Sequence, residues 1–79
     1  MSARVYVVIN TVDNTPEQIA PILKTKAGVT IVDVLEGSPS LIMMLEAESR
    51  QELADLADRA IASVEAVTKS LQLLPVMVV

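Results

Sequence analysis

The sequence predicts an α+β fold in which a four-stranded antiparallel sheet carries two helices on one of its faces. The expected order of elements is β-α-β-β-α-β. Two observations predict this order. Four short segments are rich in β-branched and aliphatic residues, and two intervening segments have apolar residues at helical spacing. A third observation concerns assembly: the central strand segments are apolar on both faces, so both faces of the sheet need a cover.

The first strand is expected over residues 5–11, a β-branched run that contains the only tyrosine of the chain. Alternate side chains of a strand point to opposite faces, so Tyr6 and Val8 lie opposite to Val7. The Asp-Asn pair at residues 13–14 then supplies turn chemistry. These features predict a strand that ends in a turn shortly after residue 11.

The first helix is expected to begin with Thr-Pro-Glu-Gln at residues 15–18, a capping box with proline at the first helical position. Its apolar stripe consists of Ile19, Ile22 and Leu23. Pro21 lacks the N–H that a helix interior needs, so either the helix is kinked or its regular part begins near Ile19. Gly28 is the expected stop.

The second and third strands are expected over residues 29–36 and 41–47, joined as a hairpin by the turn at residues 36–40. In the second strand one face is expected to carry Val29, Ile31 and Leu35. In the third strand Leu41, Met43 and Leu45 alternate with Ile42, Met44 and Glu46. Both faces of the third strand are therefore apolar until its last residues.

The second helix is expected to begin with Ser-Arg-Gln-Glu at residues 49–52, another capping box. Its apolar stripe consists of Leu53, Leu56, Ala57, Ala60, Ile61 and Val64. The fourth strand is expected over residues 67–74, where Pro75 interrupts it, because proline suits a strand edge or a bend. The apolar tail at residues 76–79 is the candidate for a short fifth strand.

Right-handed crossovers place both helices on one face of the sheet and give the strand order 4-1-3-2. The expected architecture is therefore a ferredoxin-like sandwich, formed as a single domain over residues 1–79. The first and third strands are central neighbours, and their faces away from the helices carry an apolar patch made of Tyr6, Val8, Ile42 and Met44. Because so short a chain with 52% hydrophobic residues cannot hide all of its apolar surface, we expect this patch to form a homodimer or larger homo-oligomer.

The composition excludes several function classes. The chain has no His and no Cys, which rules out imidazole and thiolate catalysis and the usual zinc sites. We expect no catalytic residues, no metal and no cofactor. The net charge of −4, with six scattered basic residues, argues against direct nucleic-acid binding. No signal peptide and no membrane-length apolar run is present, so a cytoplasmic location is expected.

The sequence resembles the effector-binding (RAM) module of the Lrp/AsnC transcription regulators, in the stand-alone form that lacks a helix-turn-helix domain. The resemblance covers nearly the whole chain through short motifs. The matching residues are Tyr6-Val7-Val8-Ile9-Asn10-Thr11, Gly28-Val29, Glu36-Gly37, Leu45-Glu46-Ala47-Glu48 and the segment of residues 64–71. The family belongs to the dimeric α+β barrel superfamily, so the resemblance implies dimers built by packing sheets together.

The resemblance also implies a non-enzymatic role in transcription regulation, with a small-molecule effector, often an amino acid, bound at the hairpin rim. Mixed assembly with a DNA-binding paralogue is a further implication. The ligand-binding residues would be Glu36, Gly37, Ser38 and Ser40. Ser40 stands where the family has an aspartate, and Glu65 or Ala66 stands where it has a second glycine. A plain hairpin turn is the alternative interpretation of these residues.

Two other functions remain open at this point. The same topology resembles the NapD-type chaperones that bind twin-arginine signal peptides, and residues 41–48 suit that family equally well. The cysteine in the first strand and the histidine in the last strand that are usual there are missing here. A dimeric α+β barrel protein of purely structural role is the other alternative.

Overall fold

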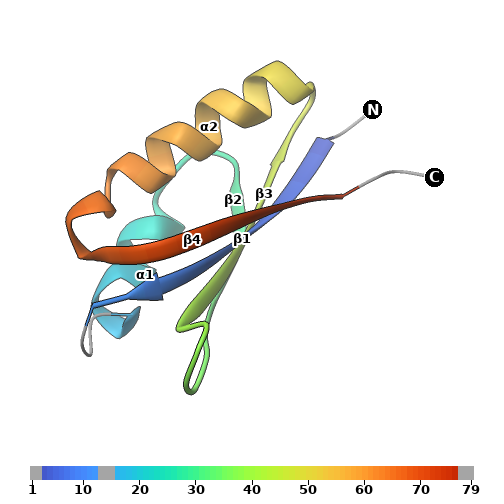
Figure 1. Cartoon of the computed structure of the whole chain (residues 1–79). Helices are drawn as coiled ribbons and strands as arrows, with labels where there is room; N and C mark the ends of the chain where they lie inside the picture. Colours follow the sequence, from blue (N-terminus) through green and yellow to red (C-terminus); the bar gives the residue numbers. More distant parts are fainter. Residues whose placement is uncertain (1–2, 13–15, 77–79) are drawn as a thin grey trace.

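The computed structural model describes residues 3–12 and 16–76. Within these residues the elements are β1 (Ala3–Thr11), α1 (Pro16–Lys24), β2 (Val29–Val34), β3 (Leu41–Ala47), α2 (Arg50–Ala62), a 3-10 turn (Glu65–Val67) and β4 (Thr68–Val76), as Figure 1 shows. The predicted order β-α-β-β-α-β is confirmed.

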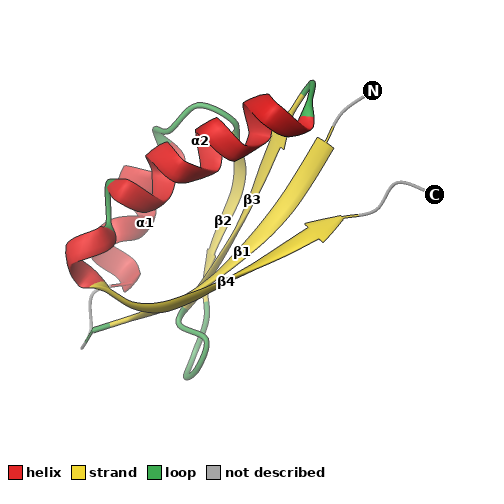
Figure 2. Ribbon diagram, turned by 45° about the horizontal axis from the view of Figure 1, so that its top comes forward, coloured by secondary structure: helices red, strands yellow, loops and turns green. Residues whose placement is uncertain are grey.

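The four strands form one antiparallel sheet in the order β2-β3-β1-β4. This is the order 4-1-3-2 that the right-handed crossover rule predicts. Both helices lie on one face of the sheet, and no described helix or loop covers the other face, the bare face (Figure 2). The fold is therefore a ferredoxin-like α+β sandwich with β1 and β3 at its centre.

The core lies between the two helices and the central strands. Side chains at alternate positions of β1 and β3 are fully buried there, namely Val7, Ile9, Leu41, Met43 and Leu45. The helix α2 covers them with Leu53, Ala57 and Ala60, and Val64 follows just beyond its end. These four belong to the predicted stripe, and the other two members, Leu56 and Ile61, are half-buried against the same core. The inward-facing residues of the strands, at every second position, thus pack against the apolar face of α2, whose residues recur every 3.6 positions.

The start of α2 confirms the predicted capping box in part. Ser49 is the N-cap, and its Oγ accepts a hydrogen bond from the backbone N–H of Glu52 at 3.2 Å. This bond satisfies one of the backbone donors that a helix leaves unpaired at its first turn. The expected cap of α1, Thr15, lies outside the described residues.

The register of α1 differs from the prediction. The helix buries Ile19, Ala20 and Leu23, whereas Ile22 is 45% exposed. The prediction that Ile22 belongs to the buried stripe is wrong, because the helix lies on the sheet with Ala20 inward instead. The helix begins at Pro16 and includes Pro21, so it does not start near Ile19.

A bulge in β2 overturns the expectation that Val29 and Ile31 share a face. Val29 pairs with Leu45, and Ile31 pairs with Met44, so a step of two residues along β2 corresponds to a step of one residue along β3. Such a bulge inverts the alternation of side chains across it. Ile31 therefore lies on the bare face, on the same side as Met44. Leu35 lies beyond the last residue of β2.

The last strand continues through Pro75, which pairs with Val5, and ends at Val76. The prediction that Pro75 interrupts the strand is wrong. Because β4 is at the edge of the sheet, a residue without a backbone N–H is tolerated there. The remaining residues of the candidate fifth strand, 77–79, lie outside the described residues. Neither helix within the described ranges has the length and apolar character that a membrane crossing requires.

Candidate functional site

The hairpin between β2 and β3 is fixed to the end of β1. The backbone N–H of Leu35 donates to the carbonyl of Ser40 at 2.8 Å and closes the turn. The N–H of Ser40 in turn donates to the carbonyl of Ile9 at 3.0 Å. The hairpin rim and the end of β1 therefore form one hydrogen-bonded unit.

The two serine hydroxyls of the hairpin are bonded to β1. Ser38 Oγ donates to Asn10 Oδ1 at 2.9 Å, and the Asn10 amide nitrogen donates to Ser70 Oγ at 3.2 Å. Ser40 Oγ accepts from the backbone N–H of Thr11 at 3.4 Å. These bonds link the hairpin, β1 and β4, so the hydroxyls position the turn.

An open cavity of about 610 Å³ lies beside the hairpin. It is enclosed by the end of β2, the turn and the first residues of α1, and the lining residues are Pro16, Glu17, Val34, Leu35, Glu36, Gly37 and Ser40. Three of the four predicted ligand-binding residues line it together. The fourth, Ser38, does not line it and contacts Asn10 instead.

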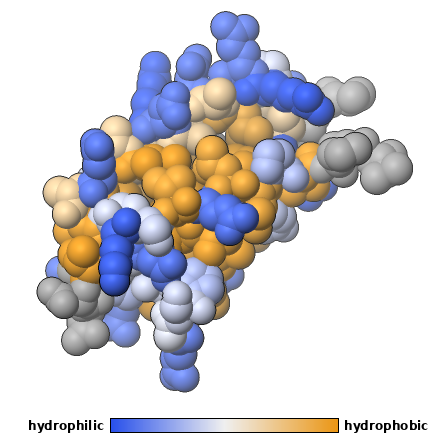
Figure 3. All heavy atoms as spheres, in the orientation of Figure 1, coloured by the Kyte–Doolittle hydropathy of each residue, from blue (hydrophilic) through white to orange (hydrophobic). Residues whose placement is uncertain are grey.

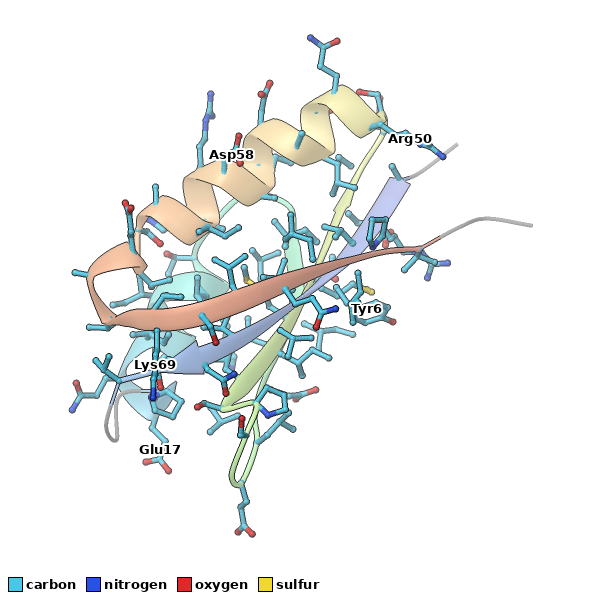
Figure 4. The ribbon with its side chains drawn as sticks, in the orientation of Figure 1. Tyr6, Glu17, Arg50, Asp58 and Lys69 are labelled. Atoms are coloured by element: carbon cyan, nitrogen blue, oxygen red, sulfur yellow. The ribbon has the colours of Figure 1, made fainter. Side chains whose placement is uncertain are left out.

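The charges and apolar groups of this cavity define what it can bind. Its two ionisable lining residues are Glu17 and Glu36, both exposed carboxylates. Val34 and Leu35 lie beside them with 42% and 39% of their surfaces exposed. Two carboxylates attract a cationic group and disfavour an anion. The lining therefore suits a small ligand with an ammonium group and an aliphatic part. Figure 4 shows Glu17 on α1, at the end of the molecule where the hairpin lies.

Gly37 takes a backbone conformation that side chains disfavour, with φ of +89°. A Cβ added there would meet no atom within 4 Å, so the turn needs glycine for its dihedral angle and not for space. The open space around Gly37 leaves the rim accessible to a ligand.

Sequence reasoning missed Pro16, Glu17, Val34 and Leu35 as lining residues. The topology could have indicated Glu17, because β1 ends and α1 begins at the same end of the sheet as the hairpin between β2 and β3. No sequence signal marked the bonds of Asn10, since polar residues at a strand end usually face water. The described residues contain no group of three or more His, Cys, Asp or Glu that could hold a metal ion.

The bare face of the sheet brings together the four residues predicted for the dimer interface. Tyr6 pairs with Met44 and Val8 pairs with Ile42 across β1 and β3. Met44 is 8% exposed, and the other three are partly exposed. On the flanking strands, Ile31 and Leu74 extend this bare apolar face with 46% and 42% exposure. Figure 4 shows Tyr6 on the side of the sheet away from α2.

Comparison with solved structures relates this fold to known ones, whereas no family model and no curated protein matches the sequence. FFRP-DM1 superposes with a TM-score of 0.82 at 13% identity, over 95% of this chain and 99% of that one. The hypothetical protein PHS023 from Pyrococcus horikoshii gives 0.85 at 14% identity, over 100% and 93%. TTHA0845 from Thermus thermophilus gives 0.82 at 18% identity, over 98% and 95%.

PH0061 is a longer chain that contains the same fold. It superposes with a TM-score of 0.84 at 11% identity over 99% of this chain, which spans only 53% of the PH0061 chain. At these identities the likeness concerns the fold. The chain therefore shares the ferredoxin-like fold of FFRP-DM1.

Proposed function

We propose that the chain is a non-enzymatic binding and regulatory module of the Lrp/AsnC effector-domain type, formed as a single cytoplasmic domain. The observation that carries the proposal is the cavity at the hairpin rim, where Glu36, Gly37 and Ser40 meet the start of α1. The absence of His and Cys from the sequence supports a role without catalysis.

The ligand class follows from the lining. An amino acid with an aliphatic side chain would place its ammonium group between Glu17 and Glu36, its side chain against Val34 and Leu35, and its carboxylate outward into water. The carboxylate of Glu36 would then take the part that the hairpin aspartate has in the family, since Ser40 occupies that position here and is bonded to Thr11.

The regulatory step would be a change of assembly. The bare sheet face, centred on Tyr6, Val8, Ile42 and Met44, would join two copies as a homodimer. A ligand at the hairpin rim would favour one larger assembly over another by binding it more tightly. Mixed assembly with a DNA-binding paralogue would carry this change to a promoter without direct contact between this chain and DNA.

The test combines native mass by light scattering with thermal unfolding, in the presence of each aliphatic amino acid in turn. We expect one of them to raise the melting temperature and to change the native mass. Binding at 100 times the dissociation constant would stabilise the folded protein by about 2.7 kcal/mol, which is a clear shift for so small a domain.

The charge-removing variant Glu36→Gln should weaken that response, because the ammonium group loses one of its two carboxylate partners. Asp58→Asn is the matched control, since Asp58 is an exposed carboxylate on α2, as Figure 4 shows, and far from the hairpin. An unchanged response in Glu36→Gln, or no response of the wild type to any amino acid, would contradict the proposal. A monomer that captures a twin-arginine signal peptide would favour the chaperone alternative instead.

A further inference from the structure

A second groove lies at the other end of the molecule, between α2 and β4. Its volume is about 480 Å³. The helix side of this groove is formed by Arg50, Leu53, Ala54 and Ala57, which follow one another at the spacing of a single helix face. Leu73 and Pro75 of β4 form the opposite wall.

The groove exists because α2 does not cover the last strand. Leu73 pairs with Val7 and Pro75 pairs with Val5, so each pair points to the same face of the sheet, toward the helices. Val7 is fully buried and Val5 is 6% exposed. Leu73, in contrast, is 47% exposed. The side of β4 that faces the helices is thus an open apolar strip, and Figure 3 shows apolar atoms gathered below α2 along this strand.

The charge around this groove is unusual for the protein. The chain carries a net charge of −4, yet none of the ten residues that line the groove is acidic, and Arg50 is the basic residue on its helix side. Among the described residues the Arg50 guanidinium has no ion-pair partner. Arg4 also lines the groove, but it alternates with Val5 along β1, so its side chain points to the bare face of the sheet. Figure 4 places Arg50 at the first turn of α2, near the start of β1 and the end of β4.

We infer that the groove between α2 and β4 binds a free aliphatic carboxylate. The alkyl chain would lie along Leu53, Ala57 and Leu73, and the carboxylate would reach the guanidinium of Arg50. The lining suits this ligand in both parts: an apolar channel for the chain, and arginine, whose planar fork matches a carboxylate, for the head group.

The length of the channel selects the chain length. Seven helical steps separate Arg50 from Ala57, which corresponds to about 10 Å along α2. This is comparable with an extended octyl chain, so octanoate is the probe. The site is separate from the hairpin cavity, because the two share no lining residue and carry opposite charges.

The experiment is a calorimetric titration of the full chain with octanoate, 1-octanol, octylammonium and butyrate, all below micelle-forming concentrations. We expect octanoate to bind about twofold to fivefold more tightly than octanol, the range of an exposed charge pair. Octylammonium should bind more weakly than octanol. Butyrate should bind at least about tenfold more weakly than octanoate, since each buried methylene is worth up to about fourfold.

Two variants with matched controls locate the site. Leu73→Ser should weaken octanoate binding. Leu71→Ser should not, because Leu71 is a similarly exposed residue on the same face of β4 but lies outside the groove. Arg50→Gln should remove the preference for octanoate over octanol, whereas Arg59→Gln, on the exposed side of the same helix, should preserve it. All four positions are exposed, so the variants should fold.

Three outcomes would overturn the inference. The first is equal binding of octanoate by wild type and Leu73→Ser. The second is binding to vesicles of an anionic phospholipid without binding of free octanoate, which would assign the groove to a membrane surface. The third is a dimer that Leu73→Ser dissociates and that octanoate neither enters nor disrupts, which would assign the groove to a second copy of the chain.

Discussion

The Cβ atom that Gly28 lacks would lie 2.7 Å from Leu56 Cδ1, so a side chain at residue 28 would force the end of the Leu56 side chain to move. The same Cβ would lie 3.2 Å from the carbonyl oxygen of Glu46. Gly28 also has a φ of +84°. Its carbonyl accepts the N–H of Glu46 at 2.8 Å, which holds this loop against β3.

Gly28→Ala should therefore destabilise the protein by about 2–4 kcal/mol, the sum of a left-handed conformation and an overpacked contact. Gly37→Ala is the matched control, because Gly37 has a similar φ of +89° and open space around it, so its loss should be limited to about 1–2 kcal/mol. Urea unfolding measures both values. Equal losses in the two variants would show that the contact with Leu56 is unimportant.

Thr11→Val should stabilise the protein by about 1–2 kcal/mol. Thr11 is 7% exposed, and its Oγ1 is buried without a hydrogen-bond partner. Because an unsatisfied buried hydroxyl costs about 1–3 kcal/mol, an apolar side chain of the same shape removes that cost. Thermal unfolding should show a higher melting temperature.

The control for this change is Thr25→Val. The hydroxyl of Thr25 is exposed and donates to the carbonyl of Ile22 at 2.7 Å. Its removal should lower the free energy of unfolding by at most about 1 kcal/mol. A decrease in the stability of Thr11→Val would mean that its hydroxyl has a partner in solution.

Ser49→Ala should cost about 1 kcal/mol, because the N–H of Glu52 loses the Oγ acceptor at the start of α2. Ser49→Asp should retain the stability, since aspartate caps equally well. Amide hydrogen exchange in the first turn of α2 should increase in the alanine variant alone. A loss of the same size in both variants would mean that the serine acts through some other contact.

Met44→Asp should dissociate the proposed homodimer, because it places a carboxylate at the centre of the bare sheet face. The substitution should also lower the stability of the monomer, since Met44 is only 8% exposed. Leu74→Asp is the second variant: Leu74 pairs with Tyr6 on the same face and is 42% exposed, so the monomer should remain folded.

Light scattering should then show the monomer mass, or at least a tenfold weaker association, for both variants. Ile22→Asp is the matched control, because Ile22 is 45% exposed on α1, away from the bare face. A native dimer mass in both Met44→Asp and Leu74→Asp would contradict the sheet-to-sheet interface.

The hairpin followed from the sequence, whereas the cavity beside it did not. The turn composition predicted the hairpin, and Glu36, Gly37 and Ser40 line the cavity as one group. The positions of the hydroxyls did not follow, because the hydrogen bonds of Ser38 and Ser40 join residues 28 and 29 positions away in the chain. Contacts at such separations depend on the packing of β1 beside the hairpin.

The residue pattern predicts the order of the elements, the Ser49 cap and the buried stripe of α2, because periodicity and capping are local properties of the chain. The strand order then follows from the handedness of the crossovers. Tertiary packing decided which apolar residues of the two edge strands stay uncovered. It turned Ile31 outward through a bulge and left Leu73 exposed opposite the fully buried Val7. The physical reason is that burial depends on where a helix lies across the sheet, which no single strand's pattern encodes.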